Sequence, residues 1–496
     1  MFGFRAIPAS LIGRDAAAQG LPLQNGFGSN RWGSITAALA SMLMSTQSAM
    51  LQSLETQKLI DRVVALVEAA RKAGADDADA VAVRSRSRGV SVRLGKVEST
   101  EASESDDIAL RVFAGKRVAS ISANASGDPT ELAQRAVAMA KVSPEDPYQG
   151  LVDPALLAKG EVDLDLFDPT DLPTDDLRDA ALEAEEAALA VKGVANSLGA
   201  GAGAGLGGLV LATSRGFVGQ YVASRFSRSV SVLAGEGTGM ERDYDYSSRL
   251  HYADLESAAA IGAKAGERAV RRLGGRKVPT GTVPVIFDPR VARGIVGHIS
   301  GAINGAGVAR RTSFLRDMMG KQVAAPSITV TDDPLRHRGQ ASHPFDGEGV
   351  RGEKLTMIDA GVLNHWLLSN SAALELGLVT NGRGSRGGSS VSPSSSNIAI
   401  EPGTVSPADM IASLKTGFYV TEVIGHGVDL VTGDYSRGAS GFWIENGELT
   451  FAVSEVTIAS NLKDMFRAMT PANDLDRDFG AAAPTLLVEG MTLAGN

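Results

Sequence analysis

The chain has 496 residues, of which 44% are hydrophobic and only 5% are aromatic. This length is too great for one hydrophobic core, so we expect two domains whose cores are mainly aliphatic. The net charge is −9 and no block of lysine or arginine stands out, which argues against nucleic-acid binding. Cysteine is absent, which excludes disulfides, thiolate metal sites and a cysteine nucleophile. A cysteine-free, mildly acidic chain suits a reducing compartment, and we predict a cytoplasmic location.

Residues 1–49 differ in composition from the remainder of the chain. They are rich in glycine, serine and alanine and loosely resemble a transit peptide. Methionines at 42, 44 and 50 precede the first strong helical pattern. We therefore interpret residues 1–49 as a disordered or mis-annotated extension and leave them out of the fold. The most apolar stretch, residues 35–50, is interrupted by Ser41, Ser45 and Gln47, so we predict no membrane span and no membrane partner.

Residues 50–275 have the pattern of an N-terminal α+β domain. Apolar residues recur at helical spacing over 57–73 and end at Gly74. Alternation over 80–121 predicts short antiparallel strands joined by tight turns, and a second helix follows over 130–141. Beyond a proline- and aspartate-rich connector, further elements are predicted as helices over 175–190 and 254–272 and strands over 209–213, 217–222 and 230–233.

A glycine-rich run at residues 198–208 includes Gly203, Gly205 and Gly208, which satisfy the G-x-G-x-x-G spacing. A dinucleotide site requires a strand before this motif and a helix after it. Here alanine and glycine precede the motif and a strand pattern follows it. We therefore predict a flexible loop, not a nucleotide site.

Residues 276–496 are rich in short strand patterns and predict a curved antiparallel sheet or barrel-like domain. The first strand, over 283–287, is followed by a helix over 289–302. Asn446–Gly447, between two strand patterns, is the strongest hairpin signal in the chain. Residues 382–396 are almost entirely glycine, serine, arginine and proline, which predicts a mobile exposed loop.

The six histidines are scattered, and no H-E-x-x-H motif is present. A catalytic zinc needs three convergent protein ligands, often with two on one helix face. By default we interpret these histidines as structural or exposed. His337 and His343 flank a loop, and with Asp346 they leave open an alternative hydrolase site.

Glycine-rich turns at 425–429 and 433–438 lie between predicted strands, and glycines let a backbone approach another chain closely. Asp434 and Arg437 could pair locally or grip a peptide terminus, and the sequence supports both interpretations equally. We take Asp434, Tyr435, Arg437 and Trp443 as candidate contacts for a substrate or partner.

Residues 432–448, TGDYSRGASGFWIENGE, form a long and specific motif. Together with residues 458–466 they resemble the C-terminal signature of TldE/PmbA subunits of TldD/TldE-type metallopeptidases. Further stretches agree, and the resemblance covers nearly all of the chain from about residue 50. These stretches are residues 240–248, 309–314, 344–349 and 483–492.

The resemblance implies an N-terminal α+β domain, a C-terminal domain of curved antiparallel sheet, and a heterodimer that degrades flexible peptides. It also implies a TldD-like partner subunit that carries zinc on an H-E-x-x-x-H motif and a distant cysteine. In this chain the motif would fall at residues 293–298. Arg293 replaces a ligand, Gly294 replaces the catalytic glutamate, and only His298 matches.

We therefore predict that this chain holds no metal and no cofactor and that it is the non-catalytic subunit, with zinc in the partner. Two alternatives remain open at this point. One is a self-sufficient hydrolase with an unrecognised site, and the other is a regulatory binding protein without a proteolytic partner.

Overall fold

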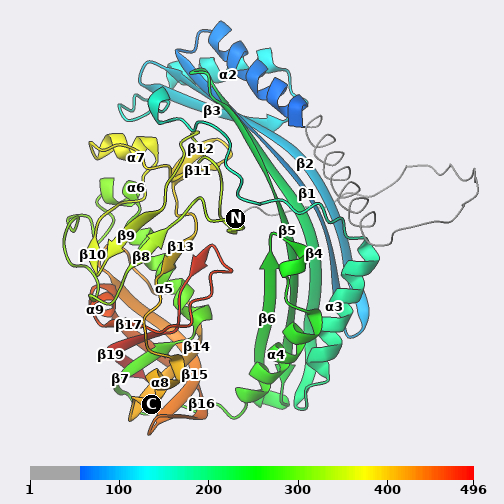
Figure 1. Cartoon of the computed structure of the whole chain (residues 1–496), viewed down its shortest axis with the longest axis vertical. Helices are drawn as coiled ribbons and strands as arrows, with labels where there is room; N and C mark the ends of the chain where they lie inside the picture. Colours follow the sequence, from blue (N-terminus) through cyan, green and yellow to red (C-terminus); the bar gives the residue numbers. More distant parts are fainter. Residues whose placement is uncertain (1–55, 496) are drawn as a thin grey trace, which may run out of the picture.

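The computed structural model describes residues 56–495 and consists of a large curved sheet that faces a C-terminal region of smaller sheets (Figure 1). This mixed α+β architecture confirms the predicted fold class. Every helix within residues 56–495 is too short or too polar to span a lipid bilayer. The predicted extension at residues 1–49 lies outside the described residues.

The large sheet is antiparallel and has the strand order β3-β2-β1-β4-β5-β6. Its strands are β1 (Asp77–Arg93), β2 (Lys96–Ala114), β3 (Arg117–Asn124), β4 (Val194–Thr213), β5 (Val218–Ala234) and β6 (Glu241–Arg249). The prediction of short strands over 80–121 was wrong, since β1 and β2 have 17 and 19 residues. The polar middle parts of these strands lack apolar alternation, yet they remain in register through ladders such as the Arg84–Asp106 ion pair at 2.7 Å.

The predicted flexible loop at residues 198–208 was also wrong, because Gly203, Gly205 and Gly208 lie in the interior of β4. This strand is paired with β1 on one side and β5 on the other, so its backbone hydrogen bonds are satisfied on both edges. Ala200 and Ala202 belong to the core formed with α3 (Thr174–Leu189), and their small side chains let that helix approach closely.

The four α-helices in the described part of this domain pack on one face of the sheet. The helix over residues 56–72 and α2 (Pro129–Val142) share a core with alternate residues at one end of β1, such as Ala80. At the other end α3 and α4 (Ala258–Arg271) pack against residues of the same parity, such as Val92. The predicted helices are thus confirmed. The opposite face is left free to contact the C-terminal region.

Five strands of the C-terminal region close into a barrel in the order β16-β15-β14-β7-β19 and back to β16, which confirms the predicted barrel-like domain. They are β7 (Gly281–Phe287), β14 (Thr416–Ile424), β15 (Asp434–Glu445), β16 (Glu448–Asn461) and β19 (Leu486–Ala494), with β17 (Met469–Pro471) added to β19. The predicted hairpin joins β15 to β16, and both Asn446 (φ 51°) and Gly447 (φ 83°) have positive φ.

A second, five-stranded sheet of short strands has the order β10-β9-β8-β13-β18. Its strands are β8 (Val330–Asp332), β9 (Leu355–Asp359), β10 (Val362–Leu363), β13 (Ile398–Ile400) and β18 (Ala481–Ala482). Helix α5 (Pro289–Ala302) contributes Val291, Ile295 and Ile299 to the large core of the C-terminal region. The remaining short elements are α6 (Gly305–Ala309), α7 (Asn370–Glu375), α8 (Pro407–Ala412), α9 (Leu462–Arg467) and single 3-10 turns at Pro154–Leu156, Gly237–Gly239 and Tyr252–Asp254.

Residues 382–396, predicted as a mobile exposed loop, instead contain the hairpin of β11 (Gly384–Gly387) and β12 (Ser390–Pro393). Arg383 and Arg386 are buried. Arg383 pairs with Asp332 at 2.9 Å, and Arg386 pairs at 2.7 Å with Asp79 of the large sheet. The loop prediction failed because composition does not reveal acidic partners so far away in the sequence.

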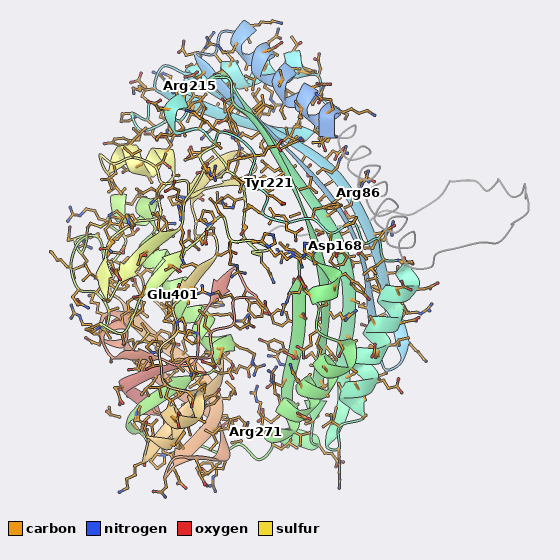
Figure 2. All side chains as sticks on the ribbon, viewed as in Figure 1. Arg86, Asp168, Arg215, Tyr221, Arg271 and Glu401 are labelled. Atoms are coloured by element: carbon orange, nitrogen blue, oxygen red, sulfur yellow. The ribbon has the colours of Figure 1, made fainter. Side chains whose placement is uncertain are left out.

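Side chains of the large sheet and of the C-terminal region meet across the free face of the sheet (Figure 2). Phe345 packs edge-on against Phe217 and Tyr221, with ring centroids 5.1 and 5.5 Å apart. These contacts, with the buried ion pair between Arg386 and Asp79, hold the two parts of the molecule together.

Candidate functional site

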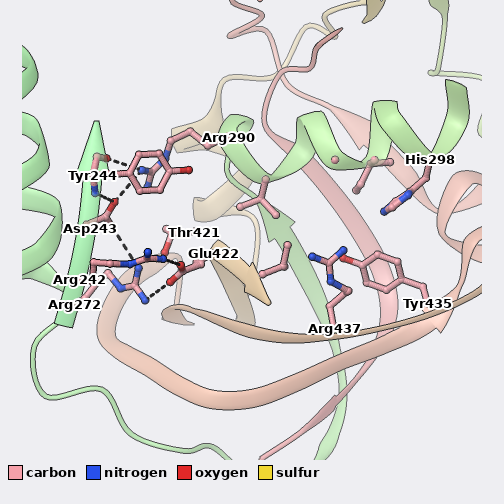
Figure 3. A pocket seen from close by; sticks show the side chains of 14 residues that line it. Arg242, Asp243, Tyr244, Arg272, Arg290, His298, Thr421, Glu422, Tyr435 and Arg437 are labelled. Atoms are coloured by element: carbon pink, nitrogen blue, oxygen red, sulfur yellow. Dashed lines mark hydrogen bonds and ion pairs between the residues drawn. The ribbon is translucent and has the colours of Figure 1, made fainter. Parts of the chain in front are cut away.

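A cavity of about 300 Å³ lies where the edge strand β6 meets helix α5 and the barrel strands β14 and β15 (Figure 3). Its volume is at the lower end of the range for small-molecule sites. It is lined by Arg242, Asp243, Tyr244, Arg272, Arg290, Val291, Gly294, Ile295, His298, Thr421, Glu422, Val423, Tyr435 and Arg437. Nine of these 14 residues are charged or ionisable, so the cavity is suited to a polar ligand.

Helix α5, which contains residues 293–298, supplies one wall of the cavity. Asp288 accepts a hydrogen bond from the Arg290 amide and caps the helix, and Pro289 occupies its first turn. Helical spacing then places Arg290, Gly294 and His298 on one face, toward the cavity.

Arg293, Gly294 and His298 of this helix have different surroundings. Arg293 does not line the cavity. Its Nη1 donates to the Tyr246 hydroxyl at 3.1 Å, and its guanidinium carbon lies 3.8 Å from the ring centroid of Phe479. Gly294 lines the cavity with no side chain. His298 lies edge-on to Tyr435, with ring centroids 6.0 Å apart.

The chemistry of these residues does not fit a zinc ion. His298 is the one imidazole in the cavity wall, and no group of three histidine, aspartate or glutamate side chains within residues 56–495 is arranged to hold a metal. Burial, and then the nearby charge of Arg437, lowers the pKa of His298. A neutral imidazole beside a guanidinium offers a metal cation one ligand and a repelling charge.

A network of ion pairs forms one end of the cavity and joins the large sheet to the barrel. Arg290 contacts Asp243 at 3.0 Å, and Arg272 contacts Glu422 at 2.6 Å. Arg242 reaches the same Glu422 at 2.9 Å. The sequence reasoning missed this network, although the dense charged and aromatic pattern of residues 240–248 was its signal.

Of the four candidate contacts, Tyr435 and Arg437 line the cavity and lie two residues apart on one face of β15. Asp434 does not join them. It is exposed and accepts hydrogen bonds from Thr432 at 2.7 Å and from Asn461 at 3.1 Å. Trp443 packs against the core of the C-terminal region, away from the cavity.

The local pair considered for Asp434 and Arg437 does not form: no ion pair joins them in the described structure. A separation of three residues places two side chains on opposite faces of a strand. The hydrogen bonds to Asp434 from Thr432 and from Asn461 lower its pKa. Arg437 donates through Nε to the carbonyl oxygen of Ile424 at 3.3 Å.

The residues of the alternative hydrolase site are not gathered into a ligand cluster in the described region. His343 is held through Nδ1 by the carbonyl of Ala341 at 3.0 Å, whereas His337 is exposed and lies 3.9 Å from Asp165. Asp346 is buried and accepts backbone N–H groups, among them that of Gly384 at 2.8 Å.

Known proteins share this combination of a large antiparallel sheet with a closed five-stranded barrel. Three family models match the chain, for domain 1 (residues 78–140), the central domain (167–273) and the C-terminal domain (280–495) of the PmbA/TldA metallopeptidases. The chain belongs to the PmbA/TldD metallopeptidase family.

Within this family the chain is similar to PmbA proteins over most of its length. It is 38% identical to metalloprotease PmbA of Escherichia coli O157:H7, covering 88% of this chain and 99% of the relative. A PmbA homologue of Haemophilus influenzae is 35% identical, with 92% and 100% covered. A TldD homologue of Buchnera aphidicola is 26% identical over 283 residues, or 52% of this chain.

Solved structures share the fold. A protein of Bacteroides thetaiotaomicron, described as a candidate modulator of DNA gyrase, is 27% identical with a TM-score of 0.81, covering 88% of this chain and 98% of that protein. TldE of Thermococcus kodakarensis has a TM-score of 0.76 at 21% identity, covering 87% and 99%. The likeness to TldE establishes the fold alone.

Proposed function

We propose that this chain is the non-catalytic subunit of a heterodimeric TldD/TldE-type peptidase that degrades unfolded or flexible peptides in the cytoplasm. A TldD-like partner carries the zinc, and this chain completes the cavity around the substrate. The observation that carries the proposal is the set of contacts made by two side chains of α5. Arg293 is committed to Tyr246 and Phe479, and His298 is left without a second ligand.

The chain's own residues account for this division of roles. Because residue 294 is glycine, this face of α5 provides no carboxylate that could accept a proton from an attacking water. What remains is a polar cavity bordered by a sheet edge, and such a surface can position a peptide without cleaving it.

The test compares the purified chain, a TldD-like relative from the same organism, and the two together. We expect the pair to co-purify and to cleave an unstructured peptide, and the chain alone to show neither cleavage nor stoichiometric zinc. A lone chain that binds one zinc and cleaves as fast as the pair would refute the proposal. Co-purification and cleavage are both measured again with Arg293→Ala in the pair, so that an effect of the variant on assembly is distinguished from an effect on catalysis.

A further inference from the structure

The cavity between β6 and the barrel has an unequal distribution of charge. Three of its four arginines, Arg242, Arg272 and Arg290, are engaged in ion pairs with Asp243 or Glu422. Glu241 lies 3.5 Å from Arg272, and Asp288 lies 3.4 Å from Arg290. This end of the cavity is therefore charge-balanced by acids of the chain itself.

Arg437 is different. Among the described residues no carboxylate lies within ion-pair distance of its guanidinium, and its Nε bond to the Ile424 carbonyl leaves both Nη groups without a protein acceptor. Figure 3 shows Arg437 at the end of the cavity opposite the ion-pair network, together with Tyr435 and His298. A half-buried guanidinium without a counter-ion is a favourable binding site for an external anion.

The two neighbours of Arg437 are neutral and can donate hydrogen bonds. Burial raises the pKa of Tyr435 to about 12, so its phenol keeps its proton. Burial and the Arg437 charge lower the pKa of His298, so this imidazole is neutral and carries one N–H. One cation and two neutral donors match a singly charged, planar anion better than a phosphate dianion.

We propose that Arg437, with Tyr435 and His298, binds a carboxylate group of a peptide in this cavity. The proposal deepens the proposed function, since it names the group through which this chain would hold a peptide. A cavity of about 300 Å³ accommodates one or two residues of a peptide, and the guanidinium can bind the carboxylate in a bidentate manner. The carboxylate can come from the C-terminus of the peptide or from an acidic side chain.

The test measures binding of peptides to the full, isolated chain by fluorescence anisotropy, so it needs neither the partner nor cleavage. The first peptide is flexible, is labelled at its N-terminus and has no aspartate or glutamate, so its C-terminus is its one carboxylate. The second has the same sequence with an amidated C-terminus. The third is amidated and has one aspartate near its end.

We expect Arg437→Gln to weaken binding of a carboxylate-bearing peptide at least about tenfold, the size of a lost charged hydrogen-bond pair. Arg437→Lys keeps the charge without the bidentate geometry and should be intermediate. Arg135→Gln removes the same charge from the exposed face of α2, far from the cavity, and should bind as the unmodified chain does. Equal melting temperatures for these variants show that folding is unaffected.

Arg437-dependent binding of the first peptide identifies the C-terminus as the source, whereas such binding of the third peptide alone identifies a side chain. Three results would overturn the inference. The first is that no peptide binds, and the second is that the first and second peptides bind equally and the third binds no better. The third is that binding is unchanged in Arg437→Gln. Because cleavage by the assembled pair is measured separately, failure here leaves the proposed function testable by itself.

Discussion

The guanidinium carbon of Arg293 lies 3.8 Å from the ring centroid of Phe479, and the same side chain donates to the Tyr246 hydroxyl at 3.1 Å. One arginine thus connects α5 with β6 of the large sheet and with the segment that precedes β18. Arg293 is thus a contact between the two parts of the molecule.

Replacement of Arg293 by alanine should therefore reduce stability. We expect the free energy of unfolding to fall by about 1–3 kcal/mol, the sum of a cation–π contact and a charged hydrogen bond. Denaturant unfolding measures the effect. Arg135→Ala on the exposed face of α2 is the matched control, and an equal, negligible change in both variants would show that the contact contributes nothing.

Arg383 and Asp332 form an ion pair whose side chains are 1% and 0% exposed, with an Nε–Oδ2 distance of 2.9 Å. Arg383→Ala would leave the Asp332 carboxylate buried with only the Ser396 amide and hydroxyl as donors. We expect a loss of about 3–5 kcal/mol, as for other buried pairs that lose one partner.

The surface pair Arg88–Asp171, with side chains 45% and 82% exposed, provides the comparison for this prediction. Arg88→Ala should cost less than about 1 kcal/mol, because solvent screens an exposed pair. Thermal unfolding of both variants measures the difference. Similar midpoints would mean that the Arg383 pair is not needed to hold the β11–β12 hairpin in place.

The sequence predicted those parts of the fold in which local pattern and tertiary structure agree. Helix α5 has its expected bounds because an aspartate cap, a proline and apolar residues at helical spacing coincide there. The hairpin at Asn446–Gly447 was predictable for a similar reason, since its two residues accept positive φ.

The sequence could not predict the features that depend on distant partners. The glycine run of β4 has the composition of a loop, and it forms a strand because β1 and β5 pair with it on either side. For the cavity, strand parity would have placed Tyr435 with Arg437 and separated Asp434 from them. The ion-pair network at its other end joins residues about 180 positions apart, such as Arg242 and Glu422, and only the fold brings them together.

Two glycines in helices should respond to alanine in opposite directions. At Gly262 of α4 an added Cβ would overlap the carbonyl oxygen of Ala184 in α3, so the two helices would have to separate. Gly294 of α5 is exposed and has no atom within 4 Å of an added Cβ.

We expect Gly262→Ala to cost about 1–3 kcal/mol through overpacking. Gly294→Ala should instead stabilise the chain by up to about 1 kcal/mol, because alanine lowers the backbone entropy of the unfolded state and favours the helix. The unfolding midpoints of the two variants measure these changes in stability. A neutral Gly262→Ala variant would contradict the close α3–α4 contact at this position.

Asp346 and Glu348 are buried together beneath the β11–β12 hairpin. Burial, and then the neighbouring charge of Glu348, raises the pKa of Asp346 to about 7, and burial also raises the pKa of Glu348. Unfolded carboxyl groups titrate near pH 4. Between about pH 4 and pH 7 the folded chain therefore retains protons that the unfolded chain has lost, so this pair makes stability fall as pH rises.

Glu348→Gln removes one of these titrating groups and one cause of the raised pKa of Asp346. It also weakens the contact with Arg111 at 3.7 Å, which lowers stability at every pH. The diagnostic quantity is therefore the difference in melting temperature between variant and unmodified chain, measured from pH 5 to pH 8. That difference should move in favour of the variant as pH rises, whereas Glu489→Gln, at an exposed position, should give a flat line. A flat line for Glu348→Gln as well would mean that the two carboxyl groups do not share their protons in the folded chain.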